Sequence, residues 1–132
     1  MSLHLGISKA PGRELIDSGA AVAVGTDLNP GSSPLFSISA ALVLAVRLNG
    51  LTAREALVAG TVNAGHALGF ADGGRIELGA QADFAVLESR DWRDLLYSMG
   101  TNPIREVWCK GSRVVSLDHN ADAKARGGRG DE

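Results

Sequence analysis

One stretch near the start of the chain combines residue types that could do chemistry. An apolar run over 20–25 predicts a buried strand, and Asp27 would stand at its carboxyl end. A Pro- and Gly-rich loop follows, and Ser33 with Pro34 has the pattern of an N-cap and a first helical position. In α/β proteins, such loops and helix N-termini form ligand and anion sites. The stretch therefore predicts a carboxylate beside an anion cradle, although an ordinary strand, turn and helix would have the same spacing.

Helical patterns flank this stretch on both sides. Residues 12–19 predict a short helix that ends at a glycine, and residues 34–49 predict a largely buried helix. A capping box at Thr52-Ala53-Arg54-Glu55 starts a further helix that ends near residue 60, and another helix is predicted from Thr61 to Gly69. A helix followed by a strand with short links is typical of an α/β architecture.

The composition changes at the turn cluster 71–74, which predicts a domain boundary. Beyond it the patterns predict a small, mostly β layer. The expected strands are 75–77, 83–87, 104–109 and 113–116, with a turn at 110–112 and a short helix at 91–99. Residues 117–132 are polar and rich in Gly, Ala and charge, so we expect them to be disordered. The predicted divisions are 1–70, 71–116 and 117–132.

The composition argues against several classes of protein. The chain has 132 residues, 45% of them hydrophobic, and 13 basic against 15 acidic side chains. No basic patch suggests nucleic acid, and no apolar run approaches the ~20 residues that span a bilayer. The single Cys109 excludes an intramolecular disulfide, and the N-terminus lacks the features of a signal peptide. We therefore expect a cytoplasmic protein that acts on neither nucleic acid nor membranes.

Four segments carry a family resemblance: 25–32, 61–69, 74–87 and 102–111. Together they resemble the C-terminal portion of an amidohydrolase-superfamily enzyme, most closely the imidazolonepropionases. The second and third segments are common to many amidohydrolases. The first is more specific, because Asn29-Pro30-Gly31 after the strand Asp is similar to the imidazolonepropionase loop. The resemblance covers roughly residues 11–116, yet only the last part of the family.

The resemblance implies a (β/α)₈ barrel with an added β-sandwich-type layer, of which this chain would hold the last strand, its helices and part of the layer. It also implies a zinc or iron site and hydrolysis of a small-molecule substrate, 4-imidazolone-5-propanoate, to N-formimidoyl-glutamate. By position, Asp27 matches the metal-ligand Asp that also acts as general base. Asn29, Gly31 and Ser32 match the loop positions that hold substrate.

The chain also departs from the family pattern. The family takes its other metal ligands from histidines earlier in the barrel, and we assign no metal to His4, His66 or His119. A complete barrel takes ~250 residues, so we expect a fragment that is inactive alone and either forms a homo-oligomer or associates with a chain supplying the missing barrel. Two alternatives remain open: a non-catalytic remnant or interaction domain, and the C-terminal part of another cyclic-amide amidohydrolase.

Overall fold

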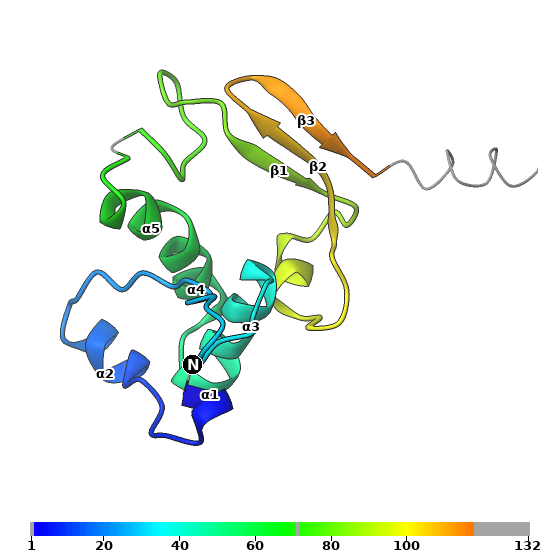
Figure 1. Ribbon diagram of the computed structural model, residues 1–132. Helices are drawn as coiled ribbons and strands as arrows, with labels where there is room; N and C mark the ends of the chain where they lie inside the picture. Colours follow the sequence, from blue (N-terminus) through cyan, green and yellow to red (C-terminus); the bar gives the residue numbers. More distant parts are fainter. Residues whose placement is uncertain (1, 71, 118–132) are drawn as a thin grey trace, which may run out of the picture.

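The chain forms a helical part followed by a small antiparallel sheet (Figure 1). The computed structural model describes residues 2–70 and 72–117. The helices are α1 (Ser2–Leu5), α2 (Gly12–Asp17), α3 (Ile38–Asn49), α4 (Ala53–Gly60), α5 (Val62–Ala67) and the 3₁₀ helix η1 (Trp92–Leu96). The strands are β1 (Phe84–Leu87), β2 (Ile104–Cys109) and β3 (Ser112–Ser116). In the described part of the chain, no helix has the length and apolar character needed to cross a membrane.

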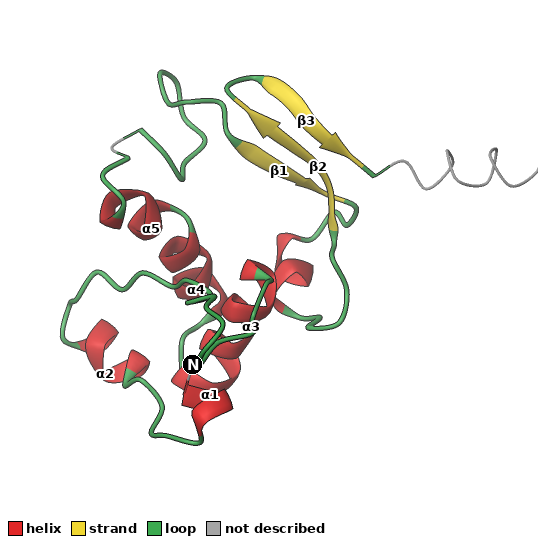
Figure 2. Ribbon diagram, in the orientation of Figure 1, coloured by secondary structure: helices red, strands yellow, loops and turns green. Residues whose placement is uncertain are grey.

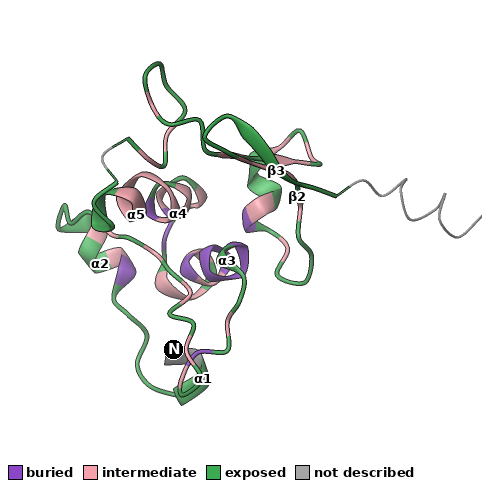
Figure 3. Cartoon of the chain, turned by 45° about the horizontal axis from the view of Figure 1, so that its top comes forward, coloured by how far each residue is buried: buried purple, intermediate pink, exposed green. Residues whose placement is uncertain are grey.

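Helix α3 is the centre of the helical part, and Figure 3 shows it as the most buried element. Its C-terminal end is as predicted, because Asn49 is the last helical residue and Gly50 adopts a left-handed φ of 74°. Leu42 and Ala45 of α3 pack in one core with the other residues of that cluster, which are Leu51, Ala56, Ala59 and Leu96. The core thus joins α3 to α4 and to η1, although η1 lies more than 40 residues further along the chain.

The predicted start of α3 at Ser33 and Pro34 was wrong. The helix begins at Ile38, and the side chain of Ser37 caps it by accepting a hydrogen bond from the backbone N–H of Ala40. Ser33 is instead buried, and its hydroxyl donates to the carbonyl oxygen of Thr26 at 2.8 Å. Both serines suit an N-cap locally. Because Ser33 donates to Thr26 and so closes the preceding loop, the N-cap of α3 is Ser37.

The capping box at the start of α4 is confirmed, and it is tied to α2 by an ion pair. Thr52 and Glu55 exchange side-chain to backbone hydrogen bonds. The guanidinium of Arg13 donates to both carboxylate oxygens of Glu55, at 2.9 and 3.1 Å. The Arg13 guanidinium, with help from the bonds to Thr52, lowers the pKa of Glu55 to about 2. Helix α2 is therefore held against the α3–α4 connection by groups that are far apart in sequence.

The sheet has the order β1-β2-β3 with antiparallel pairing, so β2 has a partner on each edge (Figure 2). Val107 of β2 lies opposite Ala85 of β1 and Val115 of β3. The β2–β3 turn is confirmed, with φ of 51° at Lys110 and 76° at Gly111, which is typical of a tight two-residue hairpin. Asp83 accepts a hydrogen bond from the Lys110 backbone N–H at 2.7 Å, which lowers the pKa of Asp83.

Other predictions were wrong or only partly right. Residues 20–25 are extended but form no strand, and residues 75–77 form none either. The helix predicted over 91–99 is the shorter 3₁₀ helix η1, with Asp91 as its cap. A strand exists only where a neighbouring strand completes its hydrogen bonds. Among the described residues, no strand lies beside 20–25. Of the tail predicted to be disordered, residues 118–132 lie outside the described residues.

Candidate functional site

The extended segment 20–26 runs along the helical part and delivers Asp27 to its surface (Figure 1). Its side chains alternate, because Val22, Val24 and Thr26 are half-buried while the odd-numbered positions are exposed. The Val24 N–H donates to the carbonyl oxygen of Ala59 at 3.0 Å, and Asn63 Nδ2 donates to the Val22 carbonyl oxygen at 2.8 Å. Sequence reasoning gave no role to Asn63. Its position as a polar residue in the first turn of a predicted helix was the only sign in the sequence that it could bond a neighbouring segment.

Asp27 lies exposed at the end of this segment. It borders an open hollow of about 460 Å³ that α2, α3 and the segment line. Its φ of 51° is left-handed, a conformation that costs most residues about 1–2 kcal/mol but that Asp adopts more readily. Asn29 Nδ2 stabilises the turn by donating to the Asp27 carbonyl oxygen at 2.7 Å. The Asp27 carboxylate has no hydrogen-bond partner in the described part of the chain, so it is available to a group from outside.

The loop after Asp27 brings the other predicted residues together in one turn. The Asn29 side-chain oxygen accepts from the backbone N–H of Gly31 at 3.0 Å and of Ser32 at 2.8 Å, and from the Ser32 hydroxyl at 3.2 Å. A backbone pair between Asn29 and Ser33 closes the loop. These are the donors that the sequence predicted for an anion, and here Asn29 occupies them. The start of α3 is not part of this turn.

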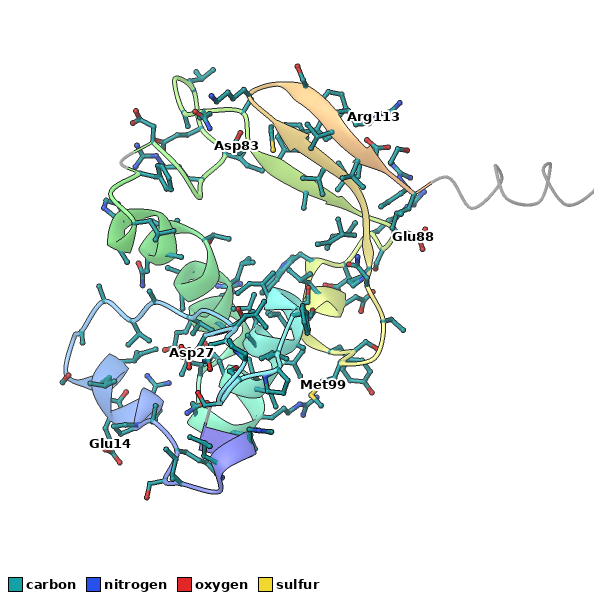
Figure 4. All side chains as sticks on the ribbon, viewed as in Figure 1. Glu14, Asp27, Asp83, Glu88, Met99 and Arg113 are labelled. Carbon is teal, nitrogen blue, oxygen red and sulfur yellow. The ribbon has the colours of Figure 1, made fainter. Side chains whose placement is uncertain are left out.

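The residues present do not make a complete metal site. Within 2–70 and 72–117, no three His, Cys, Asp or Glu side chains gather where they could hold a metal ion. Asp27 lies in the helical part, whereas Asp83 and Glu88 flank strand β1 of the sheet (Figure 4). His66 lies exposed in the last turn of α5. A hydrolytic zinc centre usually has three protein ligands, and the described residues do not bring three together.

Comparison with known sequences gives a family match over most of the chain. The amidohydrolase family matches residues 5–114. An imidazolonepropionase from Deinococcus deserti is 63% identical over 114 residues, and one from Deinococcus radiodurans is 58% identical over 114 residues. Each match covers 86% of this chain but 29% of the relative. The chain thus spans less than a third of the length of these relatives.

Solved structures give the same picture of the fold. The crystal structure of an adenosine deaminase from Xanthomonas campestris with bound zinc is 26% identical, with a TM-score of 0.75. It matches 96% of this chain and 34% of the deaminase. Escherichia coli guanine deaminase matches with a TM-score of 0.70 at 24% identity, a likeness of fold alone. In both comparisons this chain is again similar to about a third of a longer protein.

Proposed function

Because this chain belongs to the amidohydrolase family, we propose that it forms one wall of the active site of an imidazolonepropionase-type hydrolase. The observation that carries the proposal is the Asp27 carboxylate, which borders an open hollow and has no hydrogen-bond partner among the described residues. It occurs in a chain 63% identical to an imidazolonepropionase over 114 residues. The chain alone is inactive in this proposal, because the rest of the site comes from outside its 132 residues.

In this proposal, Asp27 is the general base. Its carboxylate takes a proton from the water that attacks the ring carbonyl carbon of 4-imidazolone-5-propanoate. The C–N bond then breaks, the ring nitrogen is protonated, and N-formimidoyl-glutamate forms. Asp27 would also be this chain's single contribution to a zinc or iron site. The other ligands of that metal would come from outside the described residues.

The loop after Asp27 would hold the propanoate group of the substrate. Gly31 and Ser32 would offer backbone N–H groups, and Ser32 and Asn29 would offer polar side chains. Because the Asn29 side-chain oxygen now accepts from Gly31 and Ser32, that side chain must turn away before the N–H groups can receive a carboxylate. Substrate binding would thus exchange one acceptor for another, with no net gain of unpaired donors.

We also propose where this chain sits in the larger fold. Residues 20–26 with helices α2 to α5 would be the last strand and helices of a (β/α)₈ barrel, and the three strands would belong to a β-sandwich layer. The likeness to an adenosine deaminase of which it covers 34% supports this placement. We keep the proposal of a cytoplasmic location, which rests on the sequence alone.

A non-catalytic interaction domain is the second candidate. It is favoured by the absence of a three-ligand group within the described residues. In that case the chain would keep the fold and the loop around Asp27 without turnover in any assembly.

Product formation from 4-imidazolone-5-propanoate separates the two candidates. The chain should be assayed alone and together with a co-expressed polypeptide that carries the part of the Deinococcus deserti relative outside the matched residues. We expect no turnover from the chain alone and turnover from the assembly. Asp27→Asn should lower the assembly's activity by at least about 100-fold, the size of a lost general base.

Glu14→Gln is the matched control, since Glu14 is an exposed carboxylate on α2, apart from Asp27 in Figure 4. Its assembly should keep full activity. An active assembly that tolerates Asp27→Asn would remove Asp27 from the mechanism. Turnover by the chain alone would contradict the proposal that its site is incomplete, and an inactive but fully formed assembly would favour the interaction domain.

A further inference from the structure

The turn at Asp27 is held on both sides by one residue, Ser33. The Ser33 hydroxyl donates to the carbonyl oxygen of Thr26, directly before Asp27, at 2.8 Å. The Ser33 backbone carbonyl oxygen accepts from the N–H of Asn29, two residues after Asp27, at 3.1 Å. Ser33 is 1% exposed, so its hydroxyl makes this bond away from water. One buried residue therefore brackets the residue that carries the carboxylate.

Asp27 needs such support because its backbone is left-handed, with a φ of 51°. A residue other than glycine keeps this conformation only where the surrounding structure holds it there, and such residues often pre-organise a functional group. The Thr26 hydroxyl also spans the turn, since it accepts from the N–H of Leu28 at 3.3 Å. The bond from Ser33 to Thr26 thus fixes the residue from which the turn starts.

A second hold on the turn comes from Asn29, and under the proposed function it is temporary. Asn29 Nδ2 donates to the Asp27 carbonyl oxygen at 2.7 Å, while its side-chain oxygen accepts from two backbone N–H groups of the loop. When a substrate carboxylate takes those N–H groups, the Asn29 side chain turns away and releases Asp27 as well. The Ser33 hydroxyl lies outside this exchange, because its acceptor is Thr26.

We propose that Ser33 is a positioning residue, whose buried hydroxyl keeps Asp27 in its left-handed turn while substrate displaces the Asn29 side chain. The role rests on the proposed function, in which Asp27 is the general base. Ser33 acts through Asp27 and not on the substrate, because its side chain is buried. The hold matters for the rate, since misplacement of a reacting group by about 1 Å can cost about 100-fold.

NMR on the chain alone tests the hold on the turn without any substrate. Asn29→Ala removes the temporary hold and so imitates the displaced side chain. The readout is the NOE between the Asp27 N–H and its own Hα, which is strongest when φ is about 60° because the two protons are then eclipsed. Asn29→Ala should keep this NOE, and addition of Ser33→Ala should abolish it. Loss of the NOE in Asn29→Ala alone, or its survival in the double variant, would overturn the proposal.

Kinetics of the co-expressed assembly test the consequence for the reaction. Ser33→Ala should lower kcat at least about tenfold. KM should stay close to that of the parent assembly, because Asn29 still orders the loop through Gly31 and Ser32. A merely structural role in the loop would raise KM as well, so a raised KM with an unchanged kcat would contradict the proposal.

Thr61→Val is the matched control for the kinetics. The Thr61 hydroxyl also donates to a backbone carbonyl oxygen, that of Leu57 at 2.7 Å, but it lies between α4 and α5 and outside the loop. This variant should keep the parent kcat, and a loss equal to that of Ser33→Ala would refute a specific role for Ser33. An inactive parent assembly would contradict the proposed function. The NOE of the double variant, measured on the free chain, would still decide whether Ser33 holds the turn.

Discussion

Residues 20–26 and strand β2 are two short segments that follow different courses. Residues 20–26 are small, apolar or hydroxyl residues that form no strand, whereas β2 includes the charged Arg105 and Glu106 and pairs in a sheet. Strand β2 has β1 on one edge and β3 on the other, within about 30 residues of the chain. The segment 20–26 has the helical part on one edge and an open hollow on the other. The difference lies in the partners that each extended segment meets, since a strand needs hydrogen bonds that it cannot supply itself.

The comparison also separates two ways of holding an extended segment. Strand β2 is held by repeated backbone pairing in a defined register. Residues 20–26 are held by single contacts from Ala59, Asn63 and Ser33. These contacts hold the segment through its even-numbered residues and thereby position Asp27 at its end.

Gly111→Ala should destabilise the β2–β3 turn of the sheet and has the largest expected effect on stability. Gly111 has a φ of 76°, and an added Cβ would come no closer than 4.0 Å to Ala82. The cost is therefore conformational, about 1–2 kcal/mol of unfolding free energy, measured by urea titration. Gly100→Ala is the control, because Gly100 has open space and no left-handed φ. Equal loss of stability in the two variants would contradict the turn geometry.

Acid should weaken the Arg13–Glu55 ion pair, which holds α2 against the start of α4. The pKa of Glu55 is lowered from 4.5 to about 2, chiefly by the Arg13 guanidinium. A lowered folded-state pKa gives stability that is present above the unfolded value and lost as the pH falls from 4.5 towards 2. Glu55→Gln should lose this contribution at neutral pH and show a shallower decline of melting temperature over that window. A parallel decline in both proteins would contradict the role of the pair.

Ala23→Val should leave the isolated chain almost unchanged and has the smallest effect. Ala23 is exposed and borders the open hollow beside Asp27, so the unfolding free energy should change by less than about 0.5 kcal/mol. Urea titration of the chain alone measures it. A clear loss of stability would mean that the odd-numbered face is already packed in the free chain.

Local patterns determined much of the helical part and the hairpin. The Thr52 and Glu55 capping box, the left-handed Gly50 that ends α3, and the Lys110-Gly111 turn all follow from short-range hydrogen bonds and backbone preferences, which neighbouring residues set. The sequence also grouped Asp27 with Asn29, Gly31 and Ser32, and the structure places them in one turn. The roles proposed for these residues stay predictions.

Only the tertiary structure decided the rest. Whether Ser33 or Ser37 caps α3 depended on the Thr26 carbonyl. Whether 20–25 became a strand depended on neighbouring strands, and none lies beside it among the described residues. Asn63 acquired its role because folding brought it beside Val22, 41 residues away in sequence. The sequence determined which residues could serve a site by themselves. The partners of these residues came from contacts between distant segments, such as Asn63 with Val22 and Ser33 with Thr26, which no local pattern encodes.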